Sequence, residues 1–291
     1  MNILKTTSVI ILLFITTIIT AQGPLDGYFK GRKVLDLAVS GGVQTANMYF
    51  KADGPFNYSR TLPMASVFAE LGITDRLDVI ATLPFINDKL QDIGLYAKVK
   101  MIDARLFSRP LTIAPGIGFS APVSNYNTEI KNAIGQRATQ FHGHLIAQTT
   151  LFGNVSLQIQ GTYHYALDPV PSSITASSKL IYSKNSWYLD CWYEYQQGQG
   201  EITFGGPIPY SSFREFTVDY NRIGGVIYKG LDNNWGIFVN ASTILNGLDT
   251  FNTTTVMGGF VKKFNILEHQ KKRYLEESQV PRNKFRQESN T

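Results

Sequence analysis

The feature that most constrains the fold is a long alternating segment, residues 139–167, which reads TQFHGHLIAQTTLFGNVSLQIQGTYHYAL. After a short turn at residues 152–154, apolar and polar side chains alternate strictly over residues 155–167, and residues 141–151 show a weaker form of the same pattern. A period of two places one kind of side chain on each face of a β-strand. These strands are about 13 residues long, against about 5 or 6 in soluble domains, and a tilted strand needs roughly 9 to 11 residues to cross a bilayer. The segment therefore predicts a hairpin of membrane-spanning length.

The N-terminus has the layout of a secretory signal peptide. Lys5 precedes an apolar run at residues 9–19, and the small residue Ala21 comes directly before Gln22. The run is about half as long as the roughly 20 apolar residues that a membrane helix needs. We therefore expect residues 1–21 to be a signal peptide that is removed on export; the alternative is an uncleaved N-terminal anchor.

Composition limits the class of protein. After residue 21 the sequence contains no second apolar run long enough for a transmembrane helix, so the exported chain is soluble, anchored or a membrane β-barrel. Aromatic residues make up 12% of the chain and charged residues only 17%, with 25 glycines, and this balance favours strands and turns over helices. The single cysteine, Cys191, cannot form an internal disulfide. The net charge of +5 is spread along the chain, so we expect no nucleic-acid partner.

The order of the turns predicts an antiparallel barrel. An even number of antiparallel strands, with short turns at one end and longer loops at the other, is typical of outer-membrane barrels. We therefore predict an all-β fold, a transmembrane antiparallel β-barrel of about 12 strands over residues 22–264. The two longest loops, residues 123–136 and 196–212, are candidates to fold inward as a constriction. The tight connections are residues 72–76, 108–110, 152–154, 183–186 and 229–234.

Three local expectations go with this prediction. Residues 94–107 alternate as one strand. Pro115 falls inside the strand expected over residues 111–121, and its missing N–H indicates a bulge or a position outside the central ladder. Residues 213–228 are predicted to be one strand, with a bulge at the glycine pair 224–225.

Alternation alone does not decide which face points outward, because a soluble β-sandwich would show it too. The polar face, however, carries many charged side chains, and burying them unpaired in a core would cost several kcal/mol each. A water-filled or hydrogen-bonded lumen removes this difficulty, and its mixture of lysines and acids predicts little charge selectivity. The residues expected to line the lumen are Asp36, Glu70, Lys98, Lys100, His142, His144, Gln158, Gln160, His164, Lys179, Asp190, Glu194 and Glu215.

Aromatic residues gather next to the short turns. Placed at one rim of a barrel, they would form an interfacial aromatic girdle, although the ordinary preference of aromatic residues for strands is the alternative explanation. These residues are Phe107, Phe152, Tyr182, Trp187, Tyr228, Trp235 and Phe264.

Two stretches carry a family resemblance. Residues 72–85, GITDRLDVIATLPF, and residues 90–101, LQDIGLYAKVKM, resemble the outer-membrane barrel proteins of the "MetA-pathway of phenol degradation" family, and residues 27–31, GYFKG, resemble the start of uncharacterised Bacteroidota barrels. The shared pattern covers about a third of the chain. Members of the family are described as transporters or pores, so the resemblance implies passage of small, in part hydrophobic, molecules through an outer membrane. It supplies no site residues.

The histidines are the strongest candidates for chemistry. If the hairpin turns at residues 152–154, His142 faces His164 on the polar face and His144 lies one inward position away. Three imidazoles could bind Zn²⁺, Ni²⁺ or Cu²⁺, but no CxxC or HExxH spacing supports a metal site. We therefore interpret the histidines as polar lumen residues and expect no metal, no cofactor and no catalytic residue. A barrel hydrolase that uses Ser156, Asp190 and His164 is the enzymatic alternative, although no motif surrounds these residues.

The last 27 residues, 265–291, are polar and mixed in charge, and we expect a disordered or partly helical periplasmic tail; the alternative is a contact with peptidoglycan or a partner. The sequence thus predicts a passive outer-membrane pore or transporter for a small solute. A structural or adhesive barrel with an occluded lumen, or a barrel hydrolase, are the alternatives. The expected partners are outer-membrane lipid, the barrel assembly machinery and a small-molecule solute.

Overall fold

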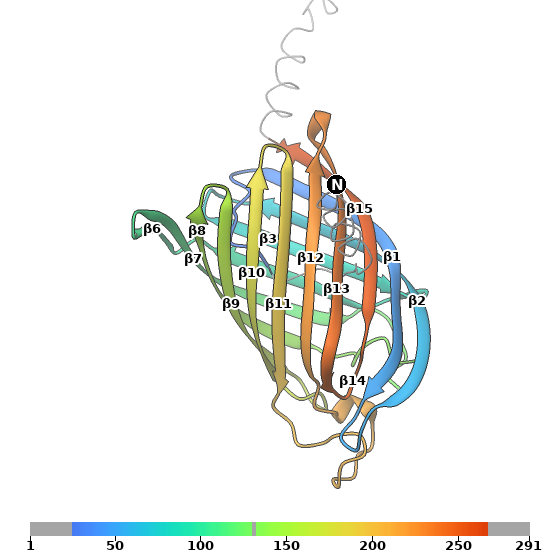
Figure 1. Cartoon of the computed structure of the whole chain (residues 1–291). Helices are drawn as coiled ribbons and strands as arrows, with labels where there is room; N and C mark the ends of the chain where they lie inside the picture. Colours follow the sequence, from blue (N-terminus) through green and yellow to red (C-terminus); the bar gives the residue numbers. More distant parts are fainter. Residues whose placement is uncertain (1–24, 130–131, 267–291) are drawn as a thin grey trace, which may run out of the picture.

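The computed structural model describes residues 25–129 and 132–266 of the chain. Within these residues, twelve long strands form a closed antiparallel barrel, which confirms the predicted fold (Figure 1). The expected signal peptide, residues 1–21, lies outside the described residues, as does the expected tail apart from residues 265–266.

Neighbours in the chain are neighbours in the barrel. Besides the twelve long strands there are three short ones, β4 (Lys89–Leu90), β6 (Ile102–Leu106) and β14 (Thr250–Phe251). Two 3-10 turns lie in the connections, η2 (Phe213–Glu215) and η3 (Asp232–Asn234). The long strands are β1 (Val34–Phe50), β2 (Phe56–Gly72), β3 (Leu77–Ile86), β5 (Asp92–Val99), β7 (Arg109–Pro122), β8 (Gln140–Phe152), β9 (Val155–Ala166), β10 (Ser173–Lys184), β11 (Trp187–Gly198), β12 (Asp219–Gly230), β13 (Trp235–Leu248) and β15 (Thr254–Asn265).

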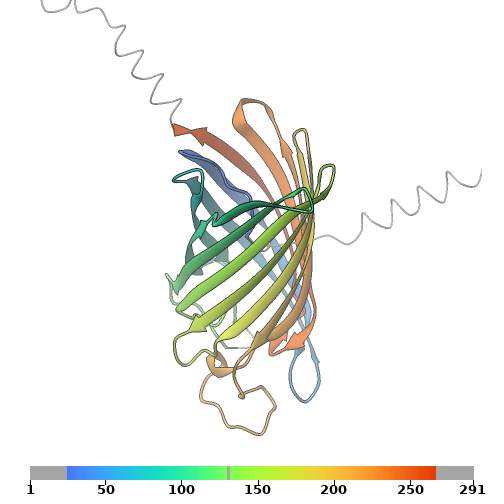
Figure 2. The ribbon, with the colours of Figure 1, turned by 90° about the vertical axis from the view of Figure 1, so that its left-hand side faces the viewer.

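The barrel closes because β1 pairs with β2 on one side and with β15 on the other. The two ends of the barrel differ, as Figures 1 and 2 show. The short turns, such as those between β8 and β9 and between β10 and β11, lie at the upper end, which we call the short-turn end. The long connection between β11 and β12 hangs below the lower end, which we call the long-loop end.

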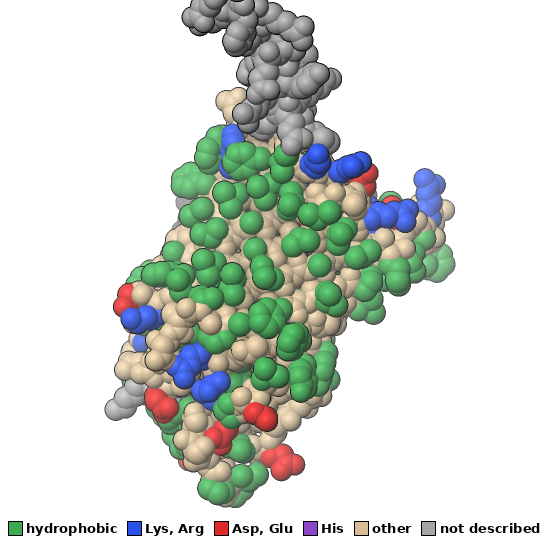
Figure 3. Space-filling model, turned by 180° about the vertical axis from the view of Figure 1, so that it is seen from behind, with side chains coloured by type: hydrophobic (Ala, Val, Ile, Leu, Met, Phe, Trp, Pro, Cys, Tyr) green, Lys and Arg blue, Asp and Glu red, His purple; other side chains and the backbone are tan. Residues whose placement is uncertain are grey.

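Apolar side chains cover the outside of the barrel, as the alternation predicts. Ile159 and Tyr163 on β9 are 56% and 45% exposed, whereas Gln158, directly before Ile159, is 1% exposed and points inward. Figure 3 shows hydrophobic side chains over the middle of the outer surface and charged side chains gathered towards its two ends. An apolar belt between charged rims is the surface expected of a barrel in a bilayer.

The hairpin of β8 and β9 has the predicted register. His142 pairs with His164 and Gln148 with Gln158, and the register shifts only beside the turn, between Thr150 and Phe152. Because paired residues point to the same side of the sheet, the polar residues of both strands face the lumen.

Two of the local expectations need correction. Residues 94–107 do not form one strand: β5 ends at Val99, and β6 pairs with β7 alone as an exposed extension. Pro115 coincides with the break. On β7, residues 109–113 pair with β6 and residues 116–122 pair with β5, whereas residues 114–115 between them pair only with β8. A residue without an N–H is tolerated where no ladder bond is required. No bulge is needed.

The segment predicted as a strand from residue 213 begins only at Asp219, because residues 213–215 form η2, capped by the Ser212 hydroxyl, which accepts from Arg214 N at 3.2 Å. The predicted bulge also lies elsewhere, between Asn221 and Arg222.

The glycine pair 224–225 serves close approach instead of a bulge. A Cβ on Gly224 would lie 2.4 Å from the carbonyl oxygen of Ala241, and one on Gly225 would lie 2.5 Å from that of Asp190. Only glycine fits against these neighbouring backbones.

Aromatic residues are exposed at the short-turn end, where Phe107, Phe152 and Trp235 are 88%, 64% and 47% exposed. Tyr228 departs from the expected girdle, because it lies on the lumen face and lines the cavity described below. Within residues 25–129 and 132–266, no helix is both long enough and apolar enough to cross a membrane.

We expect the cost of a charge on the outer face to depend on its depth. Ile159→Arg, in the middle part of β9, should destabilise the barrel by about 2–4 kcal/mol, whereas Ile174→Arg, next to the first residue of β10, should cost about 0–1 kcal/mol, because hydrocarbon gives way to headgroups near the strand ends. Urea unfolding in lipid vesicles measures both values. Equal costs at the two positions would contradict a membrane-embedded outer face.

Candidate functional site

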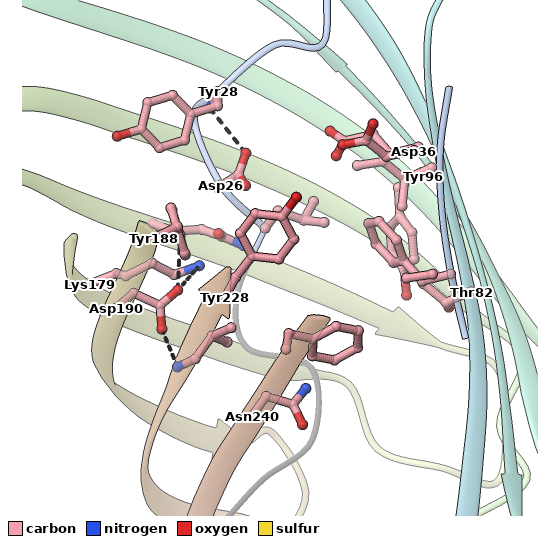
Figure 4. A pocket seen from close by; sticks show the side chains of 18 of the residues that line it. Asp26, Tyr28, Asp36, Thr82, Tyr96, Lys179, Tyr188, Asp190, Tyr228 and Asn240 are labelled. Carbon is pink, nitrogen blue, oxygen red and sulfur yellow. Dashed lines mark hydrogen bonds and ion pairs between the residues drawn. The ribbon is translucent and has the colours of Figure 1, made fainter. Parts of the chain in front are cut away.

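The lumen contains a polar cavity of about 820 Å³. It extends from the level of Gln196 and Tyr220, near the long-loop end, to Ser186 and Trp187 at the short-turn end. Figure 4 shows side chains from several strands converging on it. Ten of the residues expected to line the lumen lie on its wall: Asp36, Glu70, Lys98, His142, His144, Gln160, His164, Lys179, Asp190 and Glu194.

The other three expected lining residues do not line this cavity. Gln158 is buried behind a peptide segment described next. Lys100 directly follows the end of β5, and its ammonium lies 5.2 Å from the ring centroid of Phe29 and 3.6 Å from Asp103 Oδ2. Glu215 lies in η2 at the long-loop end, where its carboxylate accepts hydrogen bonds from Ser211, and it is not on the lumen wall because β12 begins after it.

The N-terminal residues 25–30, which we call the inner segment, run inside the barrel (Figure 4). Gly27 N donates to Gln148 Oε1 at 3.0 Å and to Gln158 Oε1 at 2.9 Å, and Gln158 Nε2 donates to Leu25 O at 2.5 Å. A Cβ on Gly27 would lie 2.8 Å from Gln148, so a larger residue would push the segment off this wall. The sequence did not predict this contact, since no local pattern marks an irregular segment that threads a barrel.

Lys98, on β5, holds the inner segment from a strand two positions round the barrel from β8 and three from β9. Its ammonium donates to Asp26 O at 2.9 Å, to Asp26 Oδ1 at 3.1 Å and to Tyr28 O at 2.6 Å, and it pairs with Glu70 Oε1 at 2.9 Å. The side chain is 1% exposed. A buried ammonium with three donors is stable only when carbonyl and carboxylate oxygens surround it, and the inner segment supplies most of them.

Lys30 ends the inner segment in a second set of ion pairs. Its backbone N–H donates to Asp78 Oδ2 at 3.0 Å, and its ammonium pairs with Asp36 at 3.2 Å and Glu70 at 3.0 Å. Burial alone would lower the pKa of Lys30, but Asp26, Glu70 and Asp36 raise it above its ordinary value. The lumen thus keeps the lysine charged because each charge has a partner.

Burial would likewise raise the pKa of Asp26, but Lys98 and Lys30 lower it below its ordinary value. Asp26 is therefore ionised at neutral pH, and its attraction to the Lys98 ammonium fixes the inner segment electrostatically as well as by hydrogen bonds.

The histidines form a hydrogen-bonded row around the wall. His142 Nδ1 lies 2.8 Å from His164 Nδ1, His142 Nε2 lies 3.0 Å from the Ser120 hydroxyl, and His164 Nε2 lies 2.9 Å from the Thr175 hydroxyl. Two Nδ1 atoms in hydrogen-bond contact share one proton, so one ring donates and the other accepts. Across residues 25–129 and 132–266, no group of three or more His, Cys, Asp or Glu is arranged to hold a metal ion.

The residues of the hydrolase alternative are not brought together. Ser156 lies near one end of β9 and His164 near the other, roughly 25 Å apart at the rise of a strand. The serine that does contact a histidine is Ser120, which alternation also places on the polar face of its strand.

A cap covers the long-loop end. We define it as the described residues of two loops, 123–129 with 132–139, and 199–218. These loops contain most of both segments that the sequence identified as candidate constrictions, but residues 196–198 of the second segment belong to β11. Side chains of each loop bond to backbone carbonyls of the other, so the two loops form one unit.

The contacts between the loops centre on one arginine. Arg214 Nε donates to Gln136 O at 3.0 Å, and Arg214 Nη2 donates to Arg137 O at 3.0 Å. In return, Gln136 Nε2 donates to Phe216 O at 2.9 Å. Phe216 is 2% exposed, and its ring packs on Phe204, Tyr210 and Phe213 of its own loop.

The first loop crosses the mouth of the barrel. Arg60 on β2 donates to Ala133 O, and Gln91, just before β5, donates to Ile134 O. The neighbouring Gln136 bonds to the second loop, which leaves the barrel between β11 and β12, far from β2 around the ring. A chain that contacts both places spans the opening.

Asp249 anchors the second loop to the barrel. Its two carboxylate oxygens accept from Phe204 N at 3.1 and 3.0 Å, and the residue is 6% exposed. Burial raises the pKa of Asp249 to about 7, the Phe204 N–H opposes the rise, and nearby Asp219 adds to it.

The closed strands, the apolar outer face and the polar lumen define a porin-like outer-membrane β-barrel that spans the membrane. No family model matches the sequence, and no curated protein matches it either, so the resemblance to the "MetA-pathway of phenol degradation" family rests on the quoted residues.

Solved structures of similar fold are outer-membrane channels and porins. An outer membrane channel from Pseudomonas putida F1 is 13% identical, with a TM-score of 0.63, over 84% of this chain and 100% of its own. The NanC porin is 10% identical with a TM-score of 0.54, over 78% of this chain and 100% of its own. The KdgM porin is 8% identical with a TM-score of 0.50, over 78% of this chain and 99% of its own. At these identities the similarity shows the fold alone.

We expect Lys98→Met to free the inner segment. The substitution leaves Glu70 and Asp26 without their shared cation, at a cost of about 3–5 kcal/mol, so the segment should leave the wall and the Gly27 amide should exchange faster with solvent deuterium. Arg222→Met, which breaks the Glu194 ion pair further along the lumen, is the matched control and should leave Gly27 protected. Unchanged exchange in Lys98→Met would show that the segment is held without the lysine.

We expect the second loop of the cap to loosen as the pH rises. The pKa of Asp249 is about 7 when the loop lies against it and near 3.8 when the carboxyl group is solvated. The contribution of Asp249 to the stability of the folded loop is therefore complete below pH 4 and is lost as the pH rises towards 7. The protection factor of the Phe204 amide, corrected for intrinsic exchange, should fall across this range and then level off. Asp249→Asn should abolish this dependence; if it persists, another group controls the loop.

Proposed function

We propose that the protein is a passive outer-membrane channel for a small solute, restricted by the inner segment and the cap. The observation that carries the proposal is the polar cavity of about 820 Å³ that runs beside the inner segment to the short-turn end. Its volume is within the range of about 300–1,000 Å³ that is typical of small-molecule sites. The similarity in fold to outer-membrane channels and porins supports the same class.

The orientation follows from the loops. Outer-membrane barrels keep short turns in the periplasm and long loops outside the cell, so the cavity would open to the periplasm and the cap would face the exterior. On this proposal residues 1–21 direct export, the barrel assembly machinery inserts the chain, and lipid surrounds the apolar belt.

A structural or adhesive barrel is the second candidate, because one observation favours it. The cap crosses the mouth at the long-loop end, and the inner segment fills part of the lumen, so the solute path is narrowed at that end and along its length. Ion conductance separates the two functions.

We expect planar-bilayer recordings of the refolded, full-length protein to show a small conductance in KCl. Deleting residues 25–31 should enlarge the current several-fold, because the lumen loses its inner segment, and shortening both loops of the cap should enlarge it again. Variants that replace outward-facing Tyr163 should match the parent current. If neither the parent nor the two deletion variants conduct, the channel is ruled out and the occluded barrel is favoured.

A further inference from the structure

The charges on the cavity wall compensate one another. Lys98 pairs with Glu70 and Asp26, and Arg222 contacts Glu194, while Lys179 Nζ lies 3.6 Å from Asp190. A charged solute would have to separate one of these buried pairs to find its counterion. The wall therefore favours an uncharged solute.

Two aromatic rings lie flat along the wall because glycines make room for them. A Cβ on Gly118 would lie 2.3 Å from Tyr96 Cδ1, so the Tyr96 ring covers the position where that side chain would be. In the same way, a Cβ on Gly236 would lie 2.3 Å from Tyr228 Cε2. A ring that lies along the wall presents its face, not its edge, to the lumen.

The two rings face the cavity from opposite sides. Around the closed ring of strands, β7, β8, β9, β10 and β11 separate β5 from β12 on one side, and β3, β2, β1, β15 and β13 separate them on the other. Figure 4 shows Tyr96 and Tyr228 on opposite walls.

Polar atoms beside the rings lack partners among the described residues. These are Nε2 of His144, Oε1 of Gln160 and Oδ1 of Asn240, and each residue is more than nine-tenths buried. All three residues line the cavity, and the His144 and Tyr96 ring centroids lie 5.7 Å apart. The Nδ1 of His144 and the Nε2 of Gln160 are engaged with Thr162. The three unpartnered atoms have almost no exposed surface, so a solute hydroxyl reaches them only when these side chains turn towards the cavity.

We infer that this cavity binds an uncharged saccharide, with one sugar face on Tyr96 and its hydroxyl groups on His144 and Gln160. The inference names the solute class of the proposed channel and rests on that function. A sugar ring combines an apolar C–H face, which packs on an aromatic ring, with hydroxyl groups that donate to buried acceptors. A purely apolar solute would leave those acceptors unpartnered, which is unfavourable.

The test uses glucose as the neutral ring, with glucosamine and glucuronate as ring analogues of either charge and toluene as the apolar molecule. Saturation-transfer NMR on the purified full-length protein measures binding of each, and interruption of the ion current in bilayers reports the same event in the channel. Glucose should bind at least about tenfold more tightly than either charged analogue or toluene. Equal or tighter binding of a charged or apolar molecule would overturn the inference.

Substitutions locate the site. Tyr96→Leu and Gln160→Leu should each weaken glucose binding about tenfold, whereas Tyr96→Phe, which keeps the ring, should stay within about twofold of the parent. Tyr163→Leu, which alters a tyrosine on the outer face, is the matched control and should change nothing. Heat-dependent mobility in SDS gels checks that each variant folds, and unchanged binding in folded Tyr96→Leu and Gln160→Leu would contradict the proposed site.

The two proposals can fail separately. A barrel that conducts ions but does not bind glucose remains a channel and loses the saccharide. A barrel that binds glucose without conducting is not a channel, and the cavity is then a saccharide site in an occluded barrel.

Discussion

The structure depends on the pairing of every strand edge. In a bilayer the backbone N–H and C=O groups have no water to bond, so a sheet can cross only when its first and last strands meet. Here β1 and β15 meet over a continuous ladder from Val34 opposite Asn265 to Thr45 opposite Thr254. This closure separates an apolar exterior from a polar interior, and the lumen exists as a result of it.

A ring of twelve strands encloses more space than its own side chains fill, since side chains just fill a barrel of about eight. The protein fills part of the excess with its own N-terminal residues. Lys98 binds the inner segment through its ammonium group, and Gln148 and Gln158 bind it through their side-chain amides. A buried ammonium or amide without a partner would be costly. The inner segment supplies those partners, so its presence stabilises the charged lumen.

The chain covers the two ends of the barrel differently. At the short-turn end the chain reverses within a few residues, and the cavity reaches the rim at Ser186 and Trp187. At the long-loop end Arg214 and Gln136 tie two loops together across the mouth through backbone carbonyls, with Asp249 fastening one loop to the barrel. The two ends of the barrel are therefore unequally covered.

The sequence by itself determined the barrel, its twelve strands, the lipid-facing side of each strand and the pairing of His142 with His164, because alternation and turn spacing are local properties of the chain. It also pointed to most of the lumen wall, and the same alternation reaches Tyr96 and Ser120. Only the tertiary structure decided that Gly27 binds Gln148 and Gln158, contacts that join residues 121 and 131 positions apart. It alone decided that Gly118 makes room for Tyr96 and that the chain re-enters the barrel only after Glu215, at the start of β12. Such contacts depend on how strands wrap around a shared interior, and no periodicity along the chain encodes that arrangement.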